Sequence, residues 1–103
     1  MVSKHYKRQR YKREKFINEY LSGDGKVIES FVVDKGHPMG KELHELRDNG
    51  LIVVFNLNSG KLCTKLLARK NQIKKLYQGV DKQAPEWILE LAAEHERLGY
   101  NKV

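Results

Sequence analysis

The chain lacks the sequence features that form disulfides, direct secretion or span a membrane. Cys63 is the only cysteine among 103 residues, so neither an internal disulfide nor a zinc site on paired cysteines can form. No apolar run approaches the roughly 20 residues of a transmembrane helix. The charged start of the chain is not followed by the apolar segment of a secretory signal. These absences predict a protein of the reducing cytoplasm with no membrane partner.

Motifs for cofactors and metals are also missing. The chain has no P-loop, no dinucleotide-binding fingerprint and no spaced cluster of histidine, cysteine and aspartate. We therefore expect neither a cofactor nor a metal. Hydrophobic residues make up 40% and charged residues 32% of the sequence, which excludes a disordered tail. The length predicts a single domain over 1–103, with residues 1–15 as a candidate basic arm.

Acidic residues are absent from residues 49–80, and Glu14 is the only one in residues 4–15. Both stretches are rich in basic side chains, and the net charge is +7. These side chains are Lys4, Lys7, Arg8, Arg10, Lys12, Arg13 and Lys15, then Lys61, Lys65, Arg69, Lys70, Lys74 and Lys75. Such clusters attract phosphate backbones through steering and counterion release. We expect a nucleic-acid partner, RNA preferred, although a solvated surface that keeps the protein soluble would have the same composition.

The C-terminal stretch has the opposite sign. Its acidic side chains are Glu86, Glu90, Glu94 and Glu96. This face could pack on the basic N-terminal helix of a second copy, which would give a homodimer. It could equally keep RNA away from one side of the molecule.

Hydrophobic periodicity predicts an α+β domain with an N-terminal helix, a four-stranded antiparallel sheet and C-terminal helices packed on one face. Helices are expected at 4–22, 71–77 and 85–98, and strands at 26–34, 42–46, 51–57 and 61–68. The strand at 51–57 is apolar on both faces and should be central. The helix at 85–98 should bury a face that includes Trp87 and His95, and Cys63 should be a buried thiol.

Two histidines lie in or beside a glycine-rich segment, and Arg69 follows the last strand. Cleavage of RNA without a metal needs a base for the 2′-hydroxyl, an acid for the leaving 5′-oxygen and a cation for the charge on phosphorus. His37, His44 and Arg69 could supply these roles as catalytic residues, with Glu42 or Glu45 orienting His44. In the alternative reading, His37 is an ordinary loop residue and His44 a hydrogen-bonded strand residue.

A second group of polar residues surrounds Arg69. The planar guanidinium of Arg69 suits bidentate binding of phosphate, although many arginines at strand ends are only solvated. Thr64 and Gln72 could hydrogen-bond a base, a sugar or a phosphate. Together with Lys65 and Lys70, they are the candidate substrate-binding residues.

The segment from Val27 to Tyr77 resembles small proteins encoded by phages and mobile elements of Gram-positive bacteria. The residues that carry the resemblance are Asp34-Lys35-Gly36-His37-Pro38-x-Gly40, Glu42-x-His44, Asp48-Asn49-Gly50, Asn56 and Thr64-Lys65-Leu66-x-Ala68-Arg69-x-x-Gln72-Ile73. Those proteins in turn look like the barnase/colicin/RelE-type superfamily of metal-independent ribonucleases. The resemblance implies a bacterial host cell, an active site on an open sheet face, and the roles given above for His37, His44 and Arg69.

Two functions follow as hypotheses. The first is a toxin-type, metal-independent endoribonuclease, which would need a protein inhibitor or a silent state. The second is a non-enzymatic phage accessory protein that binds nucleic acid or inhibits a host protein machine. A DNA-binding regulator is disfavoured, because the middle of the chain reads as strands and shows no helix-turn-helix pattern.

Overall fold

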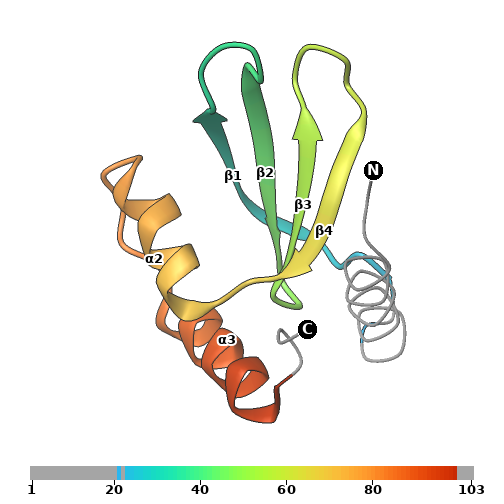
Figure 1. The fold of residues 1–103 in the computed structure, drawn as a ribbon. Helices are drawn as coiled ribbons and strands as arrows, with labels where there is room; N and C mark the ends of the chain where they lie inside the picture. Colours follow the sequence, from blue (N-terminus) through green and yellow to red (C-terminus); the bar gives the residue numbers. More distant parts are fainter. Residues whose placement is uncertain (1–20, 22, 100–103) are drawn as a thin grey trace.

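The computed structural model describes residue 21 and residues 23–99. Its elements, in chain order, are β1 (Val27–Asp34), β2 (Lys41–Arg47), β3 (Leu51–Asn56), β4 (Leu62–Leu67), α2 (Lys70–Gln78) and α3 (Glu86–Leu98) (Figure 1). The predicted α+β class, the four strands and the two C-terminal helices are confirmed. The predicted helix at 4–22 and the basic arm at 1–15 lie outside the described residues, apart from Leu21.

The strands form one antiparallel sheet in the order β1-β2-β3-β4. Each strand pairs with its chain neighbour, as short hairpin connections require. β3 is central, and its first four residues are all buried, as its continuous apolar sequence predicts. Register places His44 opposite Phe31 on one side and Val54 on the other, so all three side chains lie on one face.

The main core lies between this face and the two helices. The sheet contributes Phe31, Leu46, Ile52 and Val54, and the helices contribute Ile73, Tyr77, Ile88, Leu89 and Ala92. Phe31 and Tyr77 meet edge to face, with ring centroids 5.0 Å apart. In Figure 1, α2 and α3 lie near the end of the sheet where β4 finishes, away from the two hairpin loops at the top. The helices therefore pack against the half of the sheet that is farther from the β1–β2 and β3–β4 loops.

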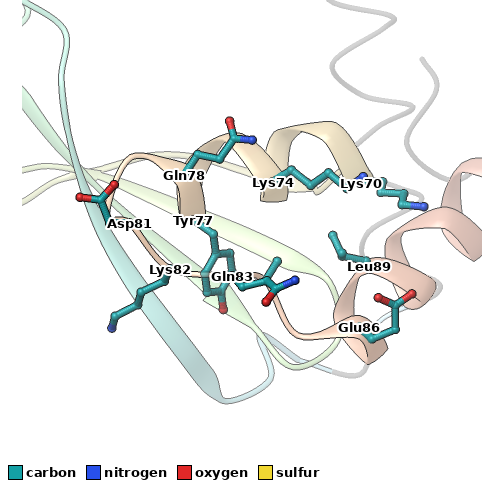
Figure 2. Close-up of a pocket in the computed structure, with 10 residues that line it drawn as sticks. Lys70, Lys74, Tyr77, Gln78, Asp81, Lys82, Gln83, Glu86 and Leu89 are labelled. Carbon is teal, nitrogen blue, oxygen red and sulfur yellow. The ribbon is translucent and has the colours of Figure 1, made fainter.

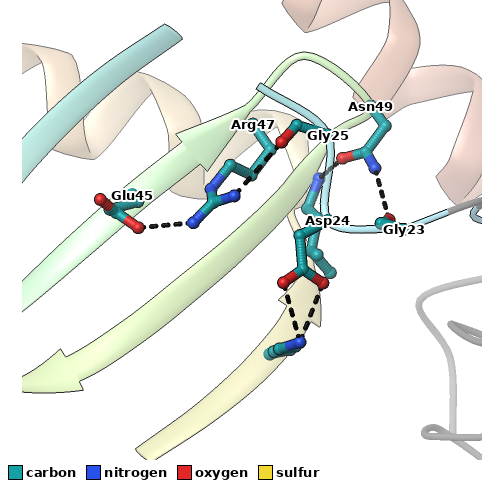
Figure 3. Close-up of polar contacts among 8 residues, drawn as sticks. Gly23, Asp24, Gly25, Glu45, Arg47 and Asn49 are labelled. Atoms are coloured by element: carbon teal, nitrogen blue, oxygen red, sulfur yellow. Dashed lines mark hydrogen bonds and ion pairs between the residues drawn. The ribbon is translucent and has the colours of Figure 1, made fainter. Parts of the chain in front are cut away.

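The opposite face of the sheet has a smaller apolar cluster. Leu51, Val53 and Leu67 are buried there, with Leu21 and Phe55 packed against them. Polar contacts attach the segment before β1 to this side (Figure 3). Lys65 donates to both carboxylate oxygens of Asp24, at 2.8 and 3.0 Å. In the same region, Arg47 bridges the Glu45 carboxylate and the Gly25 carbonyl. Asn49 donates to the Gly23 carbonyl at 3.3 Å.

The β2–β3 turn requires glycine at position 50. Gly50 has φ +84°, a backbone conformation that L-residues rarely adopt. A Cβ there would lie 3.1 Å from the imidazole of His95 on α3. The Asp48-Asn49-Gly50 sequence thus makes a tight turn and lets α3 approach the backbone closely.

Two sequence expectations about burial are wrong. Trp87 is 50% exposed, because α3 turns Ile88, Ala92 and His95 toward the sheet. The apolar face of α3 is wider than its contact with the sheet, and Trp87 lies at the uncovered edge of that face. Cys63 is exposed, because the β3–β4 register shifts beside it, so that Thr64 opposes Val54 while Leu62 opposes Phe55. His95 is buried, as expected. Within the described ranges, no helix is long and apolar enough to cross a membrane.

Candidate functional site

A groove of about 710 Å³ runs between the helix-bearing face of the sheet and α2. β1 and β2 contribute Phe31, Val33 and His44, and α2 with its preceding residue contributes Arg69, Gln72 and Lys75. The volume lies within the usual range for a ligand site. Three residues expected from sequence to act on RNA, His44, Arg69 and Gln72, therefore line one surface.

His44 lies on the floor of the groove. It is only 9% exposed, because it lies two residues before Leu46 on β2 and therefore shares the face that packs against the helices. Its Nε2 lies 3.1 Å from Oε1 of Glu42, two residues earlier on the same face. The Nδ1 atom is buried and has no hydrogen-bond partner among the described residues. An ionised carboxylate can only accept, so Nε2 of His44 donates to Glu42.

Glu42, not Glu45, orients His44. Residues two apart on a strand share a face, and adjacent residues point to opposite faces. The Glu45 carboxylate accordingly binds Arg47, at 2.6 Å, on the other side of the sheet. The sequence had left both carboxylates open as partners.

Arg69 lies at the N-terminal boundary of α2. The N–H of Ala68 donates to the Gly50 carbonyl at 2.9 Å, which holds the chain at the sheet edge where the helix begins. Arg69 is exposed and its guanidinium makes no ion pair with any described residue. The first turn of α2 contains no acid, so the positive end of the helix dipole adds to the charges of Arg69 and Lys70. This end of the groove favours an anion.

The rest of the groove mixes charge with apolar surface. Lys35 and Lys75 add cations, while Asp34 and Glu96 are the acids in its lining. Val32 and Val80, which also line it, are 60% and 42% exposed. Such a surface can hold an apolar or aromatic group next to a charged one, as an unpaired nucleotide presents.

His37 lies elsewhere. It is exposed in the β1–β2 loop and is not among the groove-lining residues, although Lys35, two residues earlier, is. The loop is closed by hydrogen bonds from Gly40 to Gly36 and from Lys35 to Gly40, at 2.7 and 2.8 Å, and the His37–Pro38 peptide is cis. The catalytic role of His37 stays a prediction.

The other expected substrate-binding residues also lie outside the groove lining. Thr64 shares the row of His44 on the helix-bearing face, with Val54 between them, about 10 Å across two strand spacings. Lys65 points to the opposite face, where it pairs with Asp24. Lys70 lines a second cavity on the far side of α2.

Sequence reasoning did not single out Lys35 or Lys75 for this site. Helical spacing offered a signal for Lys75, because it lies three residues after Gln72 and so on the same side of α2. For Lys35 there was no comparable signal. Its place in the groove depends on how far α2 extends along β1.

Two titratable groups in the core have shifted pKa values. Burial lowers the pKa of His95 from its ordinary 6.5, and the nearby negative charge of Glu94 partly opposes this. Burial and the negative charge of Glu29 both raise the pKa of the Tyr77 phenol. Neither residue lines the groove. Among residues 23–99, no group of three or more histidine, cysteine, aspartate or glutamate side chains is arranged to hold a metal.

Comparison of the chain with protein-family models, with curated proteins and with solved structures finds no match. The resemblance to phage-encoded ribonuclease-like proteins therefore stays a prediction.

Proposed function

We propose that this protein binds single-stranded RNA in the groove beside α2 and cleaves it without a metal. The observation that carries the proposal is the shared placement of His44, Arg69 and Gln72 around one cavity. The exposed Arg69 at a helix N-terminus provides a site for a phosphate.

The chemistry would be transesterification. His44 takes the proton of the 2′-hydroxyl, and the resulting oxygen attacks phosphorus to form a 2′,3′-cyclic phosphate. Arg69 stabilises the negative charge on the phosphoryl oxygens. The 5′-oxygen leaves with a proton from a second group, for which His37 is the residue predicted from sequence. Lys35 and Lys75 are the cations of the groove that would act if His37 does not.

RNA binding without cleavage is the second candidate function. The enclosure of His44 Nδ1 and the position of His37 outside the groove lining favour it, because they leave general acid–base catalysis without a complete set of exposed groups. The basic residues of α2 would then serve binding alone.

The test is cleavage of a labelled RNA pool in EDTA by the wild type, His44→Gln and Arg69→Gln. Products with 2′,3′-cyclic phosphate ends, lost in both variants, would support the proposal. Arg69 is exposed, so its substitution should leave the fold intact, and circular dichroism checks this for both variants. Lys41→Gln is the matched control, because Lys41 is exposed and lines neither cavity. No cleavage by pure wild type would refute the enzymatic function.

The variant His37→Ala then separates two mechanisms. Loss of cleavage with retained RNA binding would make His37 the second proton-transfer group. Unchanged cleavage would assign that step to a cation of the groove.

A further inference from the structure

A second cavity, of about 800 Å³, lies on the other side of α2 (Figure 2). Three segments enclose it: α2, the linker that follows it and the first turn of α3. Lys70 and Lys74, one helical turn apart, form the α2 side, and Gln78 and Gln83 add amide groups. No part of the proposed cleavage chemistry uses this cavity.

The charge of the cavity is divided between its walls. Lys70 and Lys74 are like charges at i and i+4, which repel each other on a helix, and α2 has no acidic residue to offset them. The acids, Asp81 and Glu86, belong to the linker and to α3. Lys82 already pairs with Glu29 at 3.6 Å. The α2 wall therefore presents two lysines without an ion-pair partner among the described residues.

The two cavities flank the same helix. Gln72 and Lys75 face the groove, and Lys70 and Lys74 face the second cavity, as the helical period requires. A helix with its side chains is about 10–12 Å across, a span that a short length of extended RNA backbone covers. The solvent side of α2 between them carries Asn71, Lys74, Lys75 and Gln78, all exposed. A single-stranded chain can cross this ridge without meeting a negative charge from α2.

We propose that the second cavity is a phosphate-binding subsite for the same RNA strand whose reacting phosphodiester occupies the His44 groove. This inference rests on the proposed RNA function and extends it. RNA long enough to cross α2 gains contacts to Lys70 and Lys74, whereas a short RNA fills the groove alone. The protein would therefore discriminate RNA by length, without reading the sequence of the flanking nucleotides.

The experiment measures RNA affinity by fluorescence anisotropy over a range of salt concentrations. The probes are single-stranded RNAs of about 12 and about 3 nucleotides. The variant Lys70→Gln/Lys74→Gln is compared with Lys26→Gln/Lys41→Gln, which removes the same charge from exposed lysines that line neither cavity. Each phosphate contact on a single strand contributes about 0.7 to the slope of log K against log salt. With the longer RNA, the first variant should therefore reduce the slope by roughly 1.4.

Four outcomes support or overturn the proposed subsite. A reduced slope for the longer RNA only, absent from the control variant, supports the subsite. An unchanged slope, or an equal change in the control variant, overturns it, as does a wild type that does not bind the longer RNA. The readout is binding alone, so the proposed cleavage can fail while the subsite stands. Conversely, if wild type cleaves RNA but the Lys70→Gln/Lys74→Gln variant binds it like wild type, the proposed cleavage stands and the subsite fails.

Discussion

The packing of α3 against the β2–β3 turn gives a prediction that tests the architecture behind both cavities. Gly50 and Gly60 both occupy hairpin turns at positive φ, +84° and +71°. A Cβ at Gly60 would meet nothing within 4 Å, whereas one at Gly50 would lie 3.1 Å from both Cε1 and Nδ1 of His95. Gly60→Ala is therefore a matched control for Gly50→Ala.

The two substitutions share one cost and differ in another. An alanine in the left-handed region costs about 1–2 kcal/mol, and this is the whole expected effect of Gly60→Ala. Gly50→Ala must also displace the His95 ring, which is 8% exposed and enclosed by α3 and the sheet. Overpacking of this kind costs about 1–3 kcal/mol more. In a domain of this size, each kcal/mol lowers Tm by about 4–8 °C.

The assay is urea and thermal unfolding followed by circular dichroism, for both alanine variants and for the pair Gly50→Ala/His95→Ala. Removal of the imidazole should recover the excess cost, so the double variant should be more stable than the sum of the single effects predicts, by about 1 kcal/mol or more. Equal destabilisation by the two glycine variants, together with additive behaviour of the double variant, would refute the described seating of α3 on the turn.

Two further predictions concern the core that forms the groove. Ile73 is the fully buried residue of α2, so the substitution Ile73→Ala should lower the free energy of unfolding by about 2–5 kcal/mol. The substitution Lys74→Ala, at an exposed position of the same helix, should change it by less than about 0.5 kcal/mol. Chemical denaturation measures both. The lowered pKa of His95 means that the unfolded chain takes up the proton first, so stability should be complete above pH 6.5 and decline as the pH falls from 6.5 toward the folded pKa. A His95→Gln variant should lose that part of the decline, and a Tm profile from pH 7.5 to 5 that stays identical in the variant would contradict the assignment.

Local sequence determined most of the secondary structure. β-branched runs fix strands at β1 and β3, and the glycines at 50 and 99 adopt the positive φ that ends a turn or a helix. Pro85 precedes α3 directly, as its fixed φ and missing N–H favour. These features depend on residues close together in the chain, so the sequence contains the information for them.

Burial was predictable only in part. Apolar periodicity placed Trp87 and His95 on one face of the last helix, but the sheet covers only the part of that face centred on Ile88 and Ala92. When the apolar face of a helix is wider than the surface it packs against, the sequence does not show which edge of that face stays exposed. At Cys63, a register shift between β3 and β4 broke the alternation on which the expectation of burial rested.

The candidate site was also predictable only in part. The sequence by itself determined that His44, Arg69 and Gln72 are residues able to act on a phosphodiester, because side-chain chemistry needs no fold. Only the tertiary structure decided that α2 crosses the sheet beside His44, so that Arg69, Gln72 and Lys75 share its groove while Lys70 lies across the helix. Helix placement depends on packing between Ile73, Tyr77 and strands far away in the chain, and no local pattern encodes that geometry.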